Sequence, residues 1–351
     1  IILSSNDYLI QIFALVGSFT ANLFVFSFSI LPFVLIFNFR SKYIIFGLLS
    51  IPITILLFSS FVRLYNKDNK VSDKNLITLV QPNIEQKDKW NLEKRNANLN
   101  KLTQFPLQNV DEYIGVNRII IWPETSFEGT IPNEMELLSV ISKRILTDQK
   151  AILVVGLLRV DKNKLFNSLV FLNSKGNIIH QYDKIHLVPF GEYIPLRNKF
   201  TTIANFLSLK DFSSGNIKPN FTLKGFGNIL TLICYEILFT EEVISRLSKN
   251  TNLLINITND AWFGKTIGPY QHLALAKIKA VELGIPLARV ANTGISALIS
   301  PYGEEITKIP LYESGVRTAK LSLPLKNTIY RKYGEITVSY THLTLPTNRE
   351  V

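Results

Sequence analysis

The chain has 351 residues, of which 47% are hydrophobic and 19% charged, and its formal net charge is +11. So large an apolar share excludes a disordered or fibrous protein, and a single cysteine excludes an internal disulfide framework and a cysteine-rich zinc site. The basic excess suits an anionic bilayer, which we expect as a partner in place of nucleic acid because long apolar segments lie beside it. The four histidines show no ligand spacing, so we expect neither a metal nor another cofactor.

The N-terminal part of the chain carries two long uncharged segments, residues 12–37 and 43–62. About 20 apolar residues cross the hydrocarbon core of a bilayer, so each segment is long enough to span a membrane. Buried core helices are the alternative, but such helices normally carry a polar stripe and these do not. The loop between them holds Arg40 and Lys42, and the positive-inside rule therefore places this loop in the cytoplasm and the following residues outside. We expect residues 1–66 to form a membrane part.

The sequence pattern changes after this part: short apolar runs alternate with helical patterns along residues 74–335. Such alternation is typical of a layered α/β domain. The expected strands are 76–80, 118–122, 151–155, 165–172, 229–234, 253–257, 286–291 and 296–300. The expected helices are 92–103, 134–147, 241–247 and 270–283. We expect one enzyme-sized domain.

Three residues with useful chemistry follow expected strands. Cys234 stands at a strand end just before a helix start, where α/β sheets present reactive groups. A small buried hydrophobe is the alternative for a lone cysteine, although an unpaired thiol outside the cytoplasm is more typical of a reactive group. Glu124 and Lys184 also follow strands, and a cysteine nucleophile needs a base and a positive group near the developing oxyanion. Glu124 or Lys184 alone could be a solvated surface charge, but the shared position of all three residues after strands predicts a catalytic site.

The residues around these positions resemble the Glu-Lys-Cys triad of the carbon–nitrogen hydrolase (nitrilase) superfamily. Glu124 follows Trp-Pro, Lys184 precedes a His-Leu-Val-Pro-Phe-Gly-Glu run, and Cys234 precedes Tyr-Glu. Over residues 4–335 the chain resembles the apolipoprotein N-acyltransferase family within that superfamily. The segments that carry this resemblance are 81–84 with Trp90, 189–196, 259–264, 268–272 and 289–294. The resemblance implies an α/β fold, a nitrilase-like α-β-β-α sandwich preceded by transmembrane helices.

The resemblance also implies a location, with the catalytic domain on the periplasmic side of a bacterial inner membrane and a multi-pass membrane domain. The family has further helices before the first one here, and the only methionine is Met135, so we expect an N-terminally truncated fragment. The family also has a final span where residues 338–351 are polar and end in charges. These residues cannot span a bilayer, and we interpret them as a non-native tail.

The implied reaction is a two-step acyl transfer. Cys234 takes a fatty acyl chain from a phospholipid as a thioester and passes it to the N-terminal amine of a diacylglyceryl-cysteine in an apolipoprotein. Glu124 is the implied base and Lys184 the implied positive group. Glu192, Tyr235 and Glu236 match supporting residues, although Glu236 could instead be an acid that favours a helix N-terminus.

Residues at the substrate entrance are expected in two places. Trp90 matches a loop tryptophan of the family. In residues 199–212, Phe206 and Leu207 belong to an apolar set at helical spacing that is flanked by lysines. This segment is either a lid that dips into the bilayer or a helix packed on the core. Two other functions stay open: a membrane-anchored amidase or nitrilase that uses water as second nucleophile, and a membrane scaffold without catalytic activity.

Overall fold

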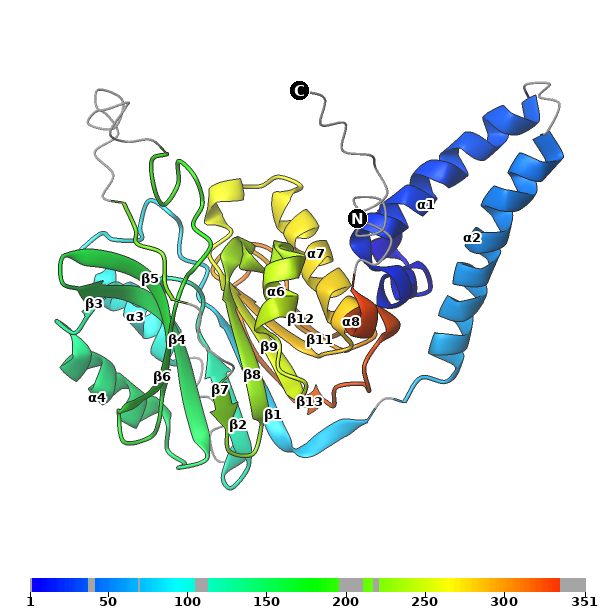
Figure 1. Cartoon of the computed structure of the whole chain (residues 1–351). Helices are drawn as coiled ribbons and strands as arrows, with labels where there is room; N and C mark the ends of the chain where they lie inside the picture. Colours follow the sequence, from blue (N-terminus) through cyan, green and yellow to red (C-terminus); the bar gives the residue numbers. More distant parts are fainter. Residues whose placement is uncertain are drawn as a thin grey trace, which may run out of the picture.

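The computed structural model describes residues 2–36, 42–68, 70–104, 113–195, 211–216 and 221–334. The predicted lid residues Phe206 and Leu207 and the tail 338–351 lie outside the described residues. Within the described part, two β-sheets packed face to face form the centre of the molecule, and a pair of long helices projects from one side (Figure 1).

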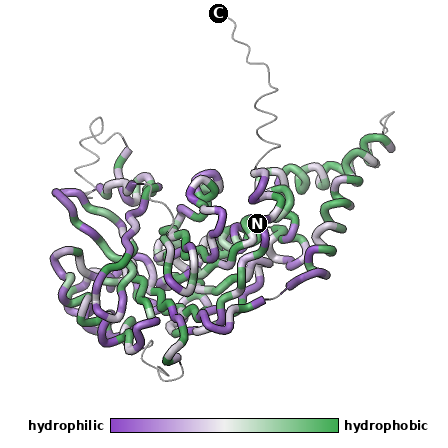
Figure 2. The backbone as a smooth tube through the Cα atoms, turned by 60° about the horizontal axis from the view of Figure 1, so that its bottom comes forward, coloured by the Kyte–Doolittle hydropathy of each residue, from purple (hydrophilic) through white to green (hydrophobic). Residues whose placement is uncertain are grey.

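Two short 3-10 helices, η1 (Ile2–Ser5) and η2 (Leu9–Ile12), lead into the long helices α1 (Phe13–Ile36) and α2 (Lys42–Tyr65). Both long helices are long and apolar enough to cross a membrane. Figure 2 shows predominantly hydrophobic residues along both of them. Many of their large apolar side chains are exposed, as Phe26 and Phe58 show with 67% each. Apolar surface on every side of a helix is typical of contact with lipid.

The base of α1 is packed against the sandwich. Gly17 has a φ of +73°, and the ring of Tyr330 lies where a Cβ on this glycine would stand. Ser18 donates a hydrogen bond to Glu282 at the end of helix α7 (Gly268–Leu283). Ile10 and Phe13 are buried in the same apolar cluster as Val281. The helix pair is therefore seated on the sandwich at its base.

Within the described ranges, the two sheets consist of seven and six strands. One sheet runs β13 (Gly315–Ser322), β1 (Val71–Gln81), β2 (Asn117–Ile121), β4 (Ala151–Asp161), β5 (Lys164–Leu172) and β6 (Ile178–Asp183), with β3 (Thr130–Ile131) paired to β4. The other runs β12 (Glu305–Ile309), β11 (Ser296–Ile299), β10 (Leu287–Ala291), β9 (Thr251–Thr258), β8 (Gly227–Ile233) and β7 (Phe221–Leu223). Strands β1, β2 and β4 are parallel, as are β8, β9 and β10.

Helices cover the outer face of each sheet and complete the layers. Helices α3 (Arg95–Gln104) and α4 (Met135–Ile145) flank the first sheet, and α6 (Thr240–Arg246) and α7 flank the second (Figure 1). A short helix, α8 (Ile329–Tyr333), follows β13. The apolar cluster between the sheets includes the fully buried Ile77, Ile119 and Ile255. The predicted α-β-β-α sandwich is confirmed.

The predicted elements of the sandwich are found, with corrections at their ends. Strands buried on both faces read as continuous apolar runs, which is why the sequence predicts them. Trp122 and Cys234 were expected inside strands but follow them, and for Cys234 the cause is a left-handed φ of +54° that no strand contains. The strand expected before Lys184, for which no bounds were predicted, is β6; the short or half-exposed strands β3, β7, β12 and β13 and the helix α8 were not predicted.

Candidate active site

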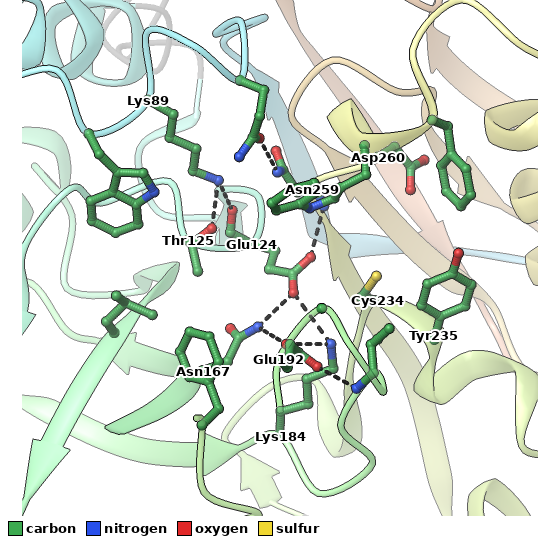
Figure 3. Close-up of a pocket in the computed structure, with 18 of the residues that line it drawn as sticks. Lys89, Glu124, Thr125, Asn167, Lys184, Glu192, Cys234, Tyr235, Asn259 and Asp260 are labelled. Atoms are coloured by element: carbon green, nitrogen blue, oxygen red, sulfur yellow. Dashed lines mark hydrogen bonds and ion pairs between the residues drawn. The ribbon is translucent and has the colours of Figure 1, made fainter. Parts of the chain in front are cut away.

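A cavity of about 500 Å³ opens at the carboxyl ends of the central strands (Figure 3). Ligands bind at this edge in α/β proteins because the loops that follow the strands converge there. Residues from both sheets line the cavity. They include Gln86, Lys89, Trp90, Glu124, Thr125, Asn167, Lys184, Glu192, Cys234, Tyr235, Asn259, Asp260, Trp262 and Phe263.

The candidate nucleophile lies at the turn that follows β8. Cys234 begins the 3-10 helix η5 (Cys234–Leu238), and its side chain is buried in the described structure. Burial raises the pKa of the Cys234 thiol above its ordinary value, and the negative charge of Glu124 adds to this, whereas Lys184 opposes it. The thiol is therefore protonated at neutral pH, and a base is needed to make it a nucleophile.

Glu124 follows β2 and is oriented by three groups. Its Oε1 accepts a hydrogen bond from Asn167 Nδ2 at 2.7 Å and lies 3.6 Å from Lys184 Nζ. Its Oε2 accepts a hydrogen bond from the backbone N–H of Asn259 at 2.9 Å. These contacts fix the direction of the carboxylate, and a fixed position is a requirement for a general base.

Lys184 follows β6, and only 1% of its side chain is exposed. Its Nζ lies 2.9 Å from Glu192 Oε1 in addition to the contact with Glu124. Burial disfavours the ammonium, but Glu124, Cys234 and Glu192 together raise the pKa of Lys184 above its ordinary value. Lys184 is therefore a permanent positive charge beside the thiol.

Asn167 on β5 was not predicted, although it joins the two carboxylates. Its Nδ2 donates to Glu124 Oε1 and, at 2.9 Å, to Glu192 Oε1. Glu192 Oε2 also accepts a hydrogen bond from the backbone of Val188 at 2.8 Å. Asn167 and Lys184 thus neutralise the repulsion between two neighbouring carboxylates. The available signal in the sequence was the polar pair Asn167-Ser168 inside a largely apolar strand.

The neighbours of the nucleophile have different surroundings. The Glu236 side chain is fully buried and accepts hydrogen bonds from the Ile233 backbone at 2.8 Å, the Tyr182 hydroxyl at 2.7 Å and the Ile185 backbone at 2.9 Å. Glu236 therefore connects the turn that carries Cys234 to the segment that carries Lys184. Its role is thus larger than that of an acid that only favours a helix N-terminus. Tyr235 stacks on His272 with ring centroids 5.4 Å apart.

A buried ionic cluster that the sequence analysis missed supports the turn after β9. Asp260 accepts hydrogen bonds from Arg289 Nη2 at 2.6 Å and from Thr258 Oγ1 at 2.9 Å, and its Oδ1 lies 2.9 Å from His272 Nδ1. Burial opposes ionisation, but Arg289 and His272 hold the pKa of Asp260 well below its usual range. These partners lie on three different elements, which gives no local pattern in the sequence.

Aromatic side chains stand at the mouth of the cavity. Trp90 lines the cavity with 46% of its surface exposed, and Trp262 in the 3-10 helix η6 (Ala261–Phe263) is 74% exposed. In the described ranges, no cluster of three or more His, Cys, Asp or Glu residues is arranged to hold a metal ion.

Comparison with known proteins places this geometry in context. Residues 76–329 match the carbon–nitrogen hydrolase family. The chain is 39% identical over 250 residues to an apolipoprotein N-acyltransferase of Rhizobium etli, which covers 68% of this chain and 46% of the relative. It is 33% identical over 270 residues to one of Vibrio cholerae, covering 74% and 52%. The chain thus spans about half the length of the curated relatives it matches.

Solved structures show the same fold at low identity. An amidase from Nesterenkonia sp. superposes with a TM-score of 0.54 at 18% identity, covering 78% of this chain and 99% of the amidase. Saccharomyces cerevisiae Nit3, a member of the nitrilase superfamily, gives 0.54 at 18%, covering 81% and 99%.

Proposed function

The chain belongs to the carbon–nitrogen hydrolase family, and we propose that it is the catalytic part of an apolipoprotein N-acyltransferase. One observation carries the proposal: Glu124, Lys184 and Cys234 meet in one cavity of a chain that resembles enzymes of that name. The proposed substrates are a phospholipid acyl donor and an apolipoprotein with an N-terminal diacylglyceryl-cysteine. Glu192, Tyr235 and Glu236 support the triad, and Trp90 contacts substrate at the mouth.

The first step forms a thioester. Cys234 Sγ attacks the ester carbonyl of the phospholipid while its proton passes to the Glu124 carboxylate. The carbonyl oxygen becomes an oxyanion that the Lys184 ammonium stabilises, and one such donor is worth about 3 kcal/mol of transition-state stabilisation. Collapse of the tetrahedral intermediate breaks the C–O bond, and Glu124 returns the proton to the leaving lysophospholipid oxygen.

The second step consumes the thioester. The free α-amine of the diacylglyceryl-cysteine attacks the carbonyl carbon, a C–N bond forms, and Glu124 accepts a proton from the nitrogen. The C–S bond then breaks and the sulfur regains the proton. An α-amine titrates at about 7.7–8.0, so a useful fraction is already neutral near pH 7.5.

The proposed location follows from the substrates and the two long helices. A phospholipid donor requires a site close to a bilayer, and α1 and α2 are seated on the sandwich at the base of α1. We infer a membrane part over residues 1–66 and a catalytic domain over residues 74–335. The site faces the periplasm of a multi-pass inner-membrane protein, with the Arg40 and Lys42 loop in the cytoplasm.

The test is a mass measurement in two stages. The chain in detergent micelles is incubated with a phospholipid of defined acyl chains, and the intact mass is expected to increase by one acyl group on Cys234. Addition of a diacylglyceryl-cysteine peptide should remove this mass and produce an N-acylated peptide. Release of free fatty acid in place of the acylated peptide, or turnover of small amides alone, would support the amidase alternative.

A further inference from the structure

Lys89 is a buried cation in a segment whose sequence predicts a solvated loop. Only 6% of its surface is exposed, although it lies in the polar run between β1 and α3, and lysine is rarely buried without a partner. Among the described residues, no carboxylate lies within ion-pair distance of its Nζ. Burial lowers the pKa of Lys89 to about 8, against which Glu124 and Glu128 act only in part. The unfavourable burial of the Lys89 ammonium therefore occurs in the wall of the cavity.

The hydrogen bonds of Lys89 go to the turn that carries the proposed base. Its Nζ donates to the backbone carbonyl of Glu124 at 3.2 Å and to Thr125 Oγ1 at 2.6 Å (Figure 3). Strand β2 has ended at Ile121, so Lys89 supplies a donor to a carbonyl that lies beyond the sheet ladder. Thr125 has a left-handed φ of +45°, a conformation that persists only where its surroundings hold it.

The same loop is also bound to the other half of the cavity. Gln86 Oε1 accepts a hydrogen bond from Asn259 Nδ2 at 2.8 Å, and the backbone N–H of Asn259 donates to Glu124 Oε2. The Ile84 N–H donates to Asn292 Oδ1 at 3.0 Å. The segment 84–90 therefore crosses between the turns that contact the backbone and the carboxylate of Glu124.

The Glu124 turn also packs closely against Gly156 on β4. A Cβ at Gly156 would stand 2.3 Å from the carbonyl oxygen of Pro123 and 2.7 Å from the Glu124 Cα. The strand backbone thus presses directly against the turn. The hydrogen bonds from Lys89 and the close approach of Gly156 together leave little freedom for the Glu124 backbone.

We infer that Lys89 is a positioning residue that clamps the Glu124 turn against β4 and so aims the carboxylate at the Cys234 thiol. The inference rests on the proposed role of Glu124 as base. The hydrogen bonds to the Glu124 carboxylate fix the end of that side chain, whereas the hydrogen bond from Lys89 fixes the Glu124 backbone. Loss of the clamp moves the base without removing it, and a displacement of about 1 Å costs about 100-fold in rate.

The test uses a small soluble ester, so that lipid access plays no part. Lys89→Met keeps the unbranched stem and removes the donors. Lys87→Met is the matched control, because Lys87 lies in the same loop with 76% of its side chain exposed. The burst of p-nitrophenol from p-nitrophenyl acetate reports acylation of Cys234. We expect a burst about 100-fold slower in Lys89→Met with little change in the KM of the ester, and no change in Lys87→Met.

Two further readouts separate positioning from a loss of stability. When a general base works, the burst rate does not change with pH across the neutral range. Without the base, the burst rate is proportional to the thiolate fraction and rises steadily with pH, and we expect this behaviour for Lys89→Met and Glu124→Gln. The double variant should be no slower than Glu124→Gln alone. Thr125→Val, which removes only one acceptor of the clamp, should slow the burst about tenfold and serves if Lys89→Met does not fold.

Some results would overturn the inference. A level pH profile in Lys89→Met, or a loss that adds in full to that of Glu124→Gln, would assign Lys89 to stability alone. A wild-type chain that is acylated by p-nitrophenyl acetate but not by phospholipid would contradict the proposed function and leave the Lys89 inference intact.

Discussion

At the floor of the cavity, Glu124 and Lys184 are buried and held by several hydrogen bonds, whereas at its mouth Trp90 and Trp262 expose 46% and 74% of their surface. Under the proposed function, this fixed floor is organised in advance for charge that develops during the reaction. The mouth offers large apolar side chains with few packing partners, and such surface gains free energy only when an apolar ligand or a membrane covers it. Substitutions at the floor should therefore impair the chemistry for every donor, and substitutions at the mouth should discriminate among donors.

The largest effect is expected from removal of the proposed nucleophile or the proposed base. Cys234→Ser and Glu124→Ala should each reduce acyl-enzyme formation by about 10³-fold or more, because the thiol is protonated and depends on its base. Intact mass spectrometry after incubation with phospholipid measures the loss. Cys234→Ser should keep the melting temperature of the parent chain. A readily detected thioester in Glu124→Ala would remove Glu124 from the role of base.

Lys184→Arg should be nearly as damaging as Lys184→Ala, at about 100-fold in the rate of acylation. The ammonium occupies a point between Glu124 and Glu192, and the larger planar guanidinium cannot replace it there. Lys175→Arg in the exposed turn before β6 provides a control for the chemical change itself. Near-normal burst kinetics in Lys184→Arg would show that a diffuse positive field is enough.

The pH dependence of the thiol should shift in opposite directions in two floor variants. The Glu124 carboxylate raises the pKa of Cys234 and the Lys184 ammonium lowers it. Glu124→Gln should therefore move the midpoint of Cys234 alkylation by iodoacetamide to lower pH, and Lys184→Met should move it to higher pH. The single cysteine makes the measurement specific. The absence of a shift in both variants would mean that burial alone sets the thiol pKa.

The residues of the cavity floor also differ in how well the sequence could predict them. Glu124 and Cys234 follow apolar strands and Lys184 follows the strand expected before it, so the order of strands already places all three at one edge of a sheet. Asn167 and Lys89 give no such signal, because their partners are far away in sequence and meet them only through the packing of strands and loops. The half-exposed strands β12 and β13 were missed because their apolar runs are short.

The smallest effect is expected at the mouth. Trp262→Ser should slow acylation by bilayer phospholipid about tenfold, since burial of a few tens of Å² of apolar surface is worth about 1.4 kcal/mol. Acylation by p-nitrophenyl acetate should change less than about twofold, because a short ester needs no apolar path from the membrane to the thiol. Val140→Ser, an exposed apolar residue on α4 with no contact to the cavity, is the control. An equal loss with both donors, or a lower melting temperature in Trp262→Ser, would show that the indole stabilises the loop and does not receive lipid.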